Sequence, residues 1–376
     1  MTSSDKIKKI VFTGGGSAGH VTPNLALIKK FQQEEWEINY IGSQTGIEKE
    51  LIAKTSVPYH IIATGKLRRY FSWQNFLDPF KIILGTIQAF ILLRRLKPTV
   101  VFSKGGFVAF PVVVAAWLNR IPAIIHEADL TIGLTNKLCL PFATKICVAF
   151  PETIKQIKNK KKAVITGIPI RKEFFHGNAE RGREICGFTP NKKIILVFGG
   201  SLGADQINKV VRQLLPDILE HFQIAHVCGE NKIDSSCNYK GYKQFAYLHE
   251  EFPHVLAAAD LVISRSGANS LYELLALHKP NILIPLAKAA SRGDQILNAK
   301  YSAERGYSEI ILQEQLTPEL LLEKIMATEK NNDTMIEAMR KFTVLDSTKL
   351  IYNIIGTVSC FFTLTSGNVN GRTPVY

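Results

Sequence analysis

The sequence GGGSAG at residues 14–19 follows the apolar run Ile10–Phe12 and nearly recurs half a chain later. The segment KKIVFTGGGSAG (8–19) returns as KKIILVFGGSLGA (192–204). A short strand that enters a glycine turn and then a helix is the opening of a doubly wound α/β domain. Two such openings predict two similar domains in one chain.

Short β-branched runs alternate with helical patterns along the chain, which indicates βαβ units and parallel sheets. The expected strands are Ile10–Phe12, Ile38–Ile41, Val100–Phe102, Ala123–Ile125, Lys145–Ala149, Ile194–Phe198, Ile224–Val227, Leu261–Ser264 and Ile282–Ile284. The main expected helices are Pro23–Gln33, Asp78–Arg95, Ala204–Glu220, Ala268–Leu277 and Asp294–Glu304. We therefore predict an α/β fold of two Rossmann-like, doubly wound parallel-sheet domains that face a cleft, because ligands bind at the carboxyl ends of such strands.

The length supports the same division, since 376 residues exceed the size at which one hydrophobic core keeps growing. We place the domain boundary at residue 167, after the lysine-rich stretch Lys155–Lys162. The expected domains are 1–166 and 167–356, with a final helix that packs back on the first domain. Residues 357–376 are expected to form a peripheral tail.

The chain carries a formal charge of +14, and eight of its basic residues lie between Lys66 and Lys104 against the single acid Asp78. A solvated face or an anionic partner would explain this excess. Six cysteines without CxxC or Cys/His spacing favour a reducing compartment and no structural zinc. The N-terminal residues lack the apolar region of a signal peptide, and no stretch reaches the roughly 20 apolar residues that span a bilayer. We therefore expect a cytoplasmic protein.

The glycine turns admit three interpretations. A nicotinamide or flavin site needs an acidic residue about 20 positions on, whereas the second expected strand ends in Gly42-Ser43-Gln44. A second possibility is a tight turn without a ligand. The third is a phosphate or sugar-phosphate site, because glycine lets the backbone approach an anion and the next helix directs N–H groups toward it.

Seven ordered motifs carry a family resemblance. They are GGGSAGHVTP (14–23), KGGFVAFP (104–111), HEADLTIGLTNK (126–137), GIPIR (167–171), GGSLGADQIN (199–208), RSGANSLYE (265–273) and RGDQILNA (292–299). Together they resemble the UDP-N-acetylglucosamine:undecaprenyl-pyrophosphoryl-MurNAc-pentapeptide N-acetylglucosaminyltransferases of peptidoglycan synthesis. The family usually has Asn where this chain has Asp129 and Ile168.

The resemblance implies a GT-B fold and an inverting, metal-independent transfer of N-acetylglucosamine from UDP to the C4 hydroxyl of the lipid-linked muramyl-pentapeptide. It implies no cofactor, no nucleic acid, and work at the cytoplasmic face of the plasma membrane. The first domain would bind acceptor and membrane, and the second UDP-N-acetylglucosamine. The chain contains no Asp-x-Asp metal motif, so helix N-termini and cations would stabilise the departing diphosphate.

The resemblance also assigns a donor site. Glu273 would accept from the ribose hydroxyls, Gln295 would bind the donor sugar, and backbone near His249 would meet uracil. Alternatively, Glu273 is only a favourable dipole partner in the first turn of a helix, and Gln295 is only an exposed helix residue. The full set of expected donor contacts is Ser17, Ala18, Gly19, Asp129, Arg171, Ser201, His249, Ala268, Asn269, Ser270, Leu271, Tyr272, Glu273 and Gln295.

Two residues compete for the role of catalytic base. His20 directly follows the first glycine turn, and a histidine can accept a hydroxyl proton at cytoplasmic pH. Glu127 is the alternative, with His126 beside it to orient the loop. A histidine that only caps the turn or binds diphosphate would also fit the pattern.

A basic, aromatic segment precedes the helix expected from Asp78, which Asp78 would cap. That helix bears an apolar stripe at helical spacing, which either faces a core or faces a membrane. Basic residues near an anionic leaflet and aromatics at its interface favour membrane binding. The expected membrane-binding residues are Arg68, Arg69, Tyr70, Phe71 and Trp73.

Two alternative functions stay open. A related glycolipid synthase with a diacylglycerol acceptor would share many of these motifs. A non-catalytic lipid-binding protein would explain the basic aromatic segment but not two phosphate turns.

Overall fold

The chain divides into two compact units. The computed structural model describes residues 8–65, 74–200, 203–288 and 293–366. The first unit comprises Met1–Pro169 and Leu345–Tyr376, and the second comprises Ile170–Val344. Every strand pair in the described residues is parallel, which confirms the prediction of two Rossmann-like parallel-sheet domains.

The first unit is built on a seven-stranded sheet in the order β3-β2-β1-β4-β5-β6-β7. Its strands are β1 (Lys9–Thr13), β2 (Glu37–Gly42), β3 (Tyr59–Ile61), β4 (Val100–Ser103), β5 (Ala123–Glu127), β6 (Lys145–Val148) and β7 (Ala163–Ile165). Its helices are α1 (Thr22–Gln33), α2 (Ile47–Ala53), α3 (Gln74–Leu96), α4 (Ala109–Leu118), α5 (Leu134–Cys139) and α13 (Ser347–Ser366). Separate apolar clusters cover its two faces, as a doubly wound sheet requires.

The second unit repeats the plan with a six-stranded sheet in the order β10-β9-β8-β11-β12-β13. Its strands are β8 (Lys193–Phe198), β9 (Phe222–Val227), β10 (Tyr242–Phe245), β11 (Leu261–Ser264), β12 (Asn281–Leu283) and β13 (Glu309–Ile310). Its helices are α6 (Ala179–Cys186), α7 (Asp205–Ile218), α8 (Phe252–Ala258), α9 (Ala268–Ala276), α10 (Asp294–Ala303), α11 (Pro318–Lys330) and α12 (Asn332–Arg340).

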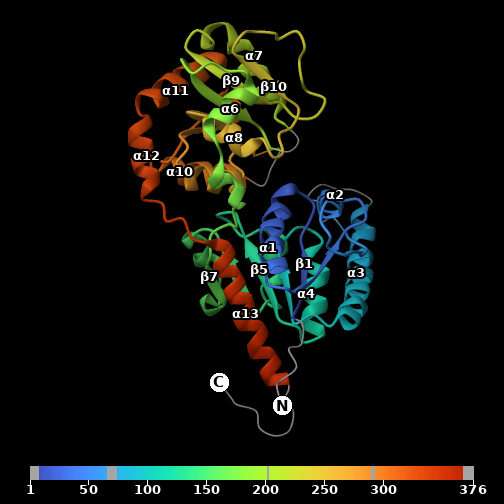
Figure 1. Ribbon diagram of the computed structural model, residues 1–376. Coiled ribbons are helices and arrows are strands. Elements are labelled where there is room, and N and C mark those ends of the chain that lie inside the picture. Colours follow the sequence, from blue (N-terminus) through green and yellow to red (C-terminus); the bar gives the residue numbers. More distant parts are fainter. Residues whose placement is uncertain (1–7, 66–73, 201–202, 289–292, 367–376) are drawn as a thin grey trace. The chain divides into compact units, whose positions relative to one another are not determined.

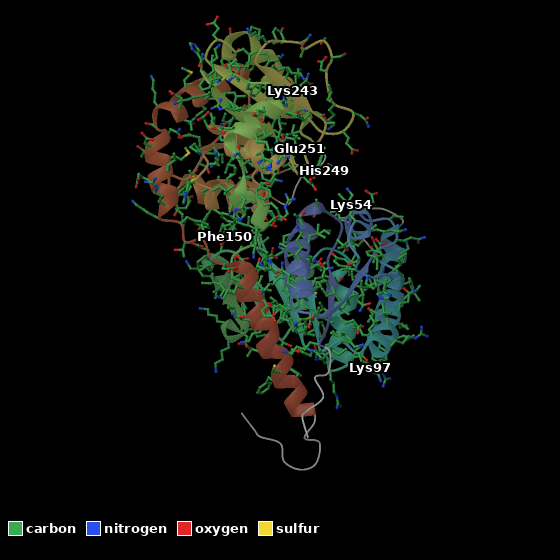
Figure 2. All side chains as sticks on the ribbon, in the orientation of Figure 1. Lys54, Lys97, Phe150, Lys243, His249 and Glu251 are labelled. Atoms are coloured by element: carbon green, nitrogen blue, oxygen red, sulfur yellow. The ribbon has the colours of Figure 1, made fainter. Side chains whose placement is uncertain are left out.

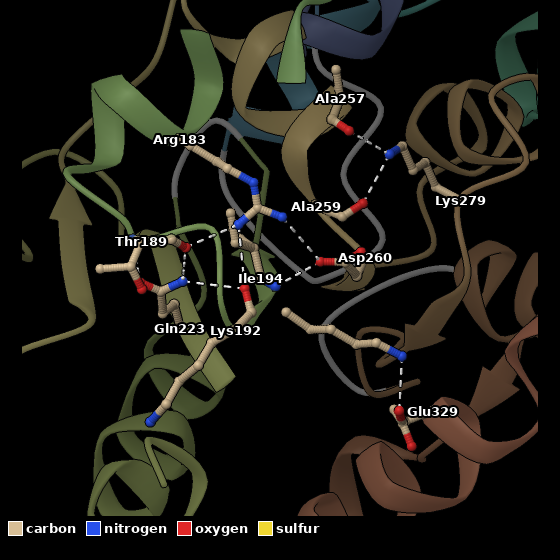
Figure 3. A network of polar contacts seen from close by, with 11 residues as sticks. Arg183, Thr189, Lys192, Ile194, Gln223, Ala257, Ala259, Asp260, Lys279 and Glu329 are labelled. Carbon is tan, nitrogen blue, oxygen red and sulfur yellow. Dashed lines mark hydrogen bonds and ion pairs between the residues drawn. The ribbon is translucent and has the colours of Figure 1, made fainter. Parts of the chain in front are cut away.

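A polar network joins elements at the amino-terminal edge of the second sheet (Figure 3). Asp260, just before β11, accepts from the Ile194 N–H at 2.8 Å, and Arg183 of α6 lies 3.9 Å from its carboxylate. Arg183 also donates to the carbonyls of Thr189 and Lys192. Ligands of such sheets bind at the opposite, carboxyl edge, so this network serves to hold α6 and the sheet together.

The last helix belongs to the first unit, where it packs beside α1 (Figure 1). Ile351, Ile355 and Val358 of α13 are buried in the cluster formed by β1, β2 and α1. The ring of Tyr352 lies 5.0 Å from that of Phe31. The tail expected from residue 357 therefore begins later, because α13 continues through Val358 to Ser366; residues 367–376 lie outside the described part.

Helix α3 also differs from expectation at its start. It begins at Gln74, so Asp78 lies inside the helix and does not cap it. Asp78 is buried with 5% of its surface exposed, and Pro79 follows it within the helix. The first turn of a helix tolerates proline because its N–H groups have no intrahelical partner, and Pro79 lies just beyond that turn.

Replacing Ile355 with alanine should destabilise the first unit by about 2–5 kcal/mol, because Ile355 is fully buried against α1 and the sheet. Urea denaturation followed by tryptophan fluorescence measures this, since Trp36, Trp73 and Trp117 all belong to the first unit. The exposed neighbour Asn353→Ala is the control and should change little. Equal midpoints for both variants would show that α13 does not stabilise the unit.

Candidate active site

The first glycine turn follows β1 and packs against the carboxylate of Glu48. No motif in the sequence indicated this residue. Glu48 is fully buried, and its carboxylate accepts from the Gly16 N–H at 3.1 Å and the Ser43 N–H at 3.2 Å. A Cβ on Gly15 would lie 2.5 Å from that carboxylate. The turn thus needs glycine because an acid side chain occupies the space beneath it.

His20 ends the short 3-10 turn η1 (Ala18–His20) that follows the glycines. Its Nδ1 lies 2.8 Å from Ser17 Oγ, and its side chain is half-buried. The N–H of His20 donates to the carbonyl of Ser17, which closes the turn. Of the predicted donor contacts in this segment, Ser17, Ala18 and Gly19 therefore lie within one turn of the candidate base.

Glu127 ends β5 and organises the loop after it. Its carboxylate accepts from the N–H of Gly133 at 2.8 Å, from Asn136 Nδ2 at 2.9 Å and from the N–H of Asp129 at 3.1 Å. Only 5% of its surface is exposed. Burial raises its pKa and Asp129 adds to this, while Asn136, Gly133 and Lys104 oppose the rise. Three donors thus occupy most of the roughly four lone-pair sites of this buried carboxylate.

His126 is fully buried beside it. Its Nε2 lies 2.8 Å from the carbonyl oxygen of Gly167, so this nitrogen carries the proton and donates it. Burial holds the pKa of His126 far below its ordinary value, and the charge of Lys104 acts in the same direction. His126 is thus a neutral side chain that ties β5 to the segment after β7.

Glu273 lies on α9 in the second unit. Since α9 begins at Ala268, Glu273 is in the second turn, and the alternative of a first-turn dipole partner is wrong. Its side chain is half-buried, and desolvation raises its pKa to about 7 while the charge of Arg171 opposes the rise. Arg171 Nε is buried without a hydrogen-bond partner among the described residues. The carboxyl group of Glu273 thus lies near Arg171, a cation that has an unused hydrogen-bond donor in this unit.

At the start of α9 the predicted donor contacts could act only through the backbone at two positions. Leu271 and Tyr272 are buried, with 0% and 1% of their surfaces exposed, so their side chains belong to the core. The N–H of Leu271 donates to the carbonyl of Gly267 at 3.0 Å. An anion at this helix start would meet the N–H groups that precede Leu271, those of Ala268, Asn269 and Ser270.

Two further predicted donor contacts have definite partners. Gln295 Oε1 accepts from the N–H of Leu286 at 3.1 Å, and its carbonyl accepts from Ser266 Oγ at 2.8 Å, which fixes Gln295 beside the start of α9. The N–H of His249 donates to Glu251 at 3.1 Å, so it is engaged in this structure (Figure 2). Ser201 lies outside the described residues.

The apolar stripe of α3 faces solvent, which excludes the alternative that it packs in a core. Helix α3 lies at the outer side of the first unit (Figure 1) and buries Ala89 and Leu93. The five exposed side chains, with exposed fractions of 47–70%, are Phe80, Ile83, Leu84, Ile87 and Ile91. The predicted membrane residues Arg68, Arg69, Tyr70, Phe71 and Trp73 lie outside the described part. Within the described residues, no helix is long and apolar enough to cross a membrane.

Comparison with known proteins identifies the family. Residues 10–148 match the glycosyltransferase family 28 N-terminal domain, and residues 194–354 match its C-terminal domain. A protein of Lachnoclostridium phytofermentans named UDP-N-acetylglucosamine--N-acetylmuramyl-(pentapeptide) pyrophosphoryl-undecaprenol N-acetylglucosamine transferase is 54% identical over 93% of this chain and 98% of its own. The chain belongs to this transferase family. A relative of the same name from Clostridium kluyveri is 51% identical over 93% of this chain and 99% of its own.

A solved structure agrees. The crystal structure of MurG from Acinetobacter baumannii superposes with a TM-score of 0.75 and 26% identity, over 93% of this chain and 99% of that one. As a family 28 glycosyltransferase, the chain carries both family domains, with one glycine turn in each unit.

Glu273→Gln should change how stability depends on pH. Because the pKa of Glu273 rises from its ordinary 4.5 to about 7 on folding, the folded chain binds more protons than the unfolded chain in this window. Stability therefore falls as pH rises from 4.5 to 7. Glutamine does not titrate, so the melting temperature of the variant should gain on that of the wild type between pH 5 and pH 8. The control Glu304→Gln, at an exposed position, should run parallel to the wild type. A parallel curve for Glu273→Gln would show that the carboxyl is not desolvated.

Proposed function

We propose that this chain transfers N-acetylglucosamine from UDP-N-acetylglucosamine to the C4 hydroxyl of undecaprenyl-pyrophosphoryl-MurNAc-pentapeptide, with inversion and without a metal. The observation that carries the proposal is that relatives named for this transfer match along 98% and 99% of their own length. The chain thus aligns with almost the whole length of these relatives and not with one of their domains alone.

The assay that tests the proposal measures UDP release from UDP-N-acetylglucosamine with two acceptors. We expect release with the muramyl lipid and none above background with diacylglycerol. Release that requires diacylglycerol would make the chain a glycolipid synthase. The absence of both UDP binding and UDP release with either acceptor would favour a lipid-binding protein.

For the donor we propose that Glu273 accepts from the ribose hydroxyls and that Arg171 meets the diphosphate. The half-buried carboxylate of Glu273 supports the first role, since hydrogen bonds to a charged group contribute about 1.5–3 kcal/mol. The unpartnered Nε of Arg171 supports the second. Gln295 would bind the sugar with an amide whose orientation Leu286 fixes.

For the base we propose His20 over Glu127. The reaction needs an acceptor of the C4 hydroxyl proton as the oxygen attacks C1 and UDP departs. Three donors bind the carboxylate of Glu127 and only 5% of its surface is exposed, whereas His20 is half-buried in a turn and is contacted at Nδ1 by Ser17. Nε2 of His20 would then take the proton.

His20→Ala should lower kcat by about 10²–10⁴-fold, the usual contribution of a general base, while the Kd for UDP-N-acetylglucosamine changes little. Steady-state kinetics and calorimetric titration with the donor measure the two effects. Loss of donor affinity in proportion to rate would make His20 a binding residue. A pH–rate profile that keeps its acid limb in the variant would also count against His20 as the base.

For the membrane we propose that the exposed stripe of α3 docks on the anionic cytoplasmic leaflet. Five large apolar side chains on one helix form a patch of the kind that marks interaction sites. Arg94 and Arg95 at the end of α3 are exposed and basic, and each basic residue near an anionic surface contributes about 1 kcal/mol.

Replacing Ile83 and Ile87 together with serine should weaken binding to anionic vesicles by about 30-fold, if each isoleucine contributes about 1 kcal/mol to insertion. Vesicle co-sedimentation at two salt concentrations measures this, and binding should weaken with salt. The control is Ile233→Ser in the second unit, where the isoleucine is as exposed as Ile87, at 52%. If the double variant binds the vesicles as strongly as the wild type, the docking surface does not lie on α3.

A further inference from the structure

The three glycines of the first turn do little to fix their own conformation. Gly14 and Gly16 have φ values of +154° and +86°, and a residue without a side chain adopts many other conformations equally well. Other segments of the first unit hold the turn. The carbonyl of Gly14 accepts from the hydroxyl of Tyr40 in β2 at 2.7 Å. The N–H of Gly15 donates to the carbonyl of Gly105, after β4, at 3.3 Å.

Glu48 holds the third glycine, and its two carboxylate oxygens have different partners. Oε2 accepts from the N–H of Gly16 at 3.1 Å, whereas Oε1 accepts from both the N–H and the hydroxyl of Ser43. The side chain is fully buried and comes from α2, which contacts β2 and β3. A Cβ on Gly15 would lie 2.5 Å from the carboxylate, and a Cβ on Gly46 would overlap it. One oxygen of an enclosed carboxylate is thus bound to the turn.

Residues 17–20, which we call the base turn, start directly after this contact. Ser17 has an extended backbone, with φ −154° and ψ 155°. Its carbonyl accepts from the N–H of His20, and its hydroxyl lies 2.8 Å from His20 Nδ1, so the two residues form one piece. Gly16 and Ser17 are exposed. A rotation of the backbone at Gly16 would therefore swing the base turn, and His20 with it, relative to the sheet.

We propose that Glu48 is a positioning residue of the transfer reaction, whose carboxylate fixes through the N–H of Gly16 the direction in which the base turn presents His20. A base must lie within hydrogen-bond reach of the proton it takes, and a misplacement of about 1 Å can cost about 100-fold in rate. The catalytic part rests on the proposed function, in which His20 is the base. The part that concerns the turn does not, because the contact lies within the first unit and needs no substrate.

The variant Glu48→Gln changes the two oxygens in different ways. Glutamine keeps one acceptor oxygen, and an NH2 group takes the place of the other. With its oxygen toward Ser43, glutamine retains two hydrogen bonds, and its NH2 group then faces the N–H of Gly16, so that donor meets donor. The variant thus keeps the shape of the side chain and loses the contact with the turn. The control is Glu50→Gln, the same change at an exposed position of α2.

Hydrogen exchange of the free protein, resolved by residue with NMR, tests the turn. In Glu48→Gln we expect the N–H of Gly16 to exchange about tenfold faster than in the wild type or more, because a hydrogen bond to a charged group is lost. The N–H of Val101, which donates to the carbonyl of Pro122, reports on unfolding of the whole unit and should accelerate far less. Equal acceleration at Gly16 and Val101, or none at Gly16, would overturn the proposal.

The rate tests whether Glu48 acts through the base. We expect Glu48→Gln to lower kcat by about tenfold or more, while KM for UDP-N-acetylglucosamine changes less. In the His20→Ala background the same change should lower kcat by less than about threefold, because the group that it positions is gone. Equal losses in both backgrounds would mean a structural role alone and would overturn the proposal. If His20→Ala itself leaves kcat unchanged, the proposed base and the catalytic part are both wrong, and exchange at Gly16 still decides whether Glu48 fixes the turn.

Should Glu48→Gln fail to fold, Gly46→Ala decides the question with the glutamate intact. Alanine fits the backbone of Gly46, which has φ −84° and ψ 155°, but its methyl group would take the place of the Glu48 carboxylate and push it away from Gly16. We expect the same faster exchange of the Gly16 N–H and the same dependence of the loss in kcat on His20. The control is Gly356→Ala in α13, where an added Cβ would meet none of the described atoms within 4 Å. Exchange at Gly16 at the wild-type rate in Gly46→Ala would overturn the proposal.

Discussion

The close approach of two loops at the carboxyl edge of the first sheet is the constraint on which the candidate site depends. The N–H of Gly15, after β1, donates to the carbonyl of Gly105, after β4, at 3.3 Å. A Cβ on Gly106 would lie 2.0 Å from the carbonyl oxygen of Gly15. The two backbones can touch only because both loops are rich in glycine, and this contact fixes where η1 and His20 begin.

Buried charge surrounds this contact, and stability alone does not explain it. Glu48 lies under the glycine turn, and Lys104 and Glu127 lie beside it, each with at most 5% of its surface exposed. Replacing buried ions with apolar side chains is often neutral or stabilising. Such groups are instead typical of sites where loops must keep one shape, since each carboxylate here binds backbone N–H groups of a loop. The first unit thus keeps buried charges, which add little to its stability, at the edge where we propose that the reaction occurs.

The sequence predicted the interior of both sheets and missed their edges. All nine expected strands exist, whereas the four missed strands, β3, β7, β10 and β13, are the two edges of each sheet. Edge strands pair on one side only, so short segments such as Tyr242–Phe245 (YKQF) can be polar and carry no apolar run. The stripe of α3 shows the same limit, because helical spacing reveals an apolar face but not what lies against it.

The candidate site divides in a similar way. Residues with a motif, such as His20 and Glu273, could be selected from the sequence, whereas Glu48 and Lys104 could not be assigned a role. Glu48 lies on α2, far along the chain from the turn it holds, and no spacing rule connects the two. Lys104 belongs to the KGGFVAFP motif, but its burial depends on β4 being flanked by β1 and β5. The contact of Glu48 with the turn and the burial of Lys104 both depend on the long-range topology of the sheet, which a local sequence pattern does not contain.

Each of the two glycine turns connects the first strand of its unit to a helix, but the segments that follow the turns differ. After the first turn the chain makes η1, and α1 begins only at Thr22, with Pro23 removing one of the N–H groups at its start. After the second turn the chain enters the longer helix α7 at Asp205, with Ala204 as its N-cap. Because α1 starts some residues after the turn and has fewer free N–H groups there, the segment between them can present a side chain, here that of His20. A helix that begins at once directs its dipole into the turn and suits an anion. The near-repeat in the sequence therefore fits the two tasks that we propose for the two units, proton transfer in the first and diphosphate binding in the second.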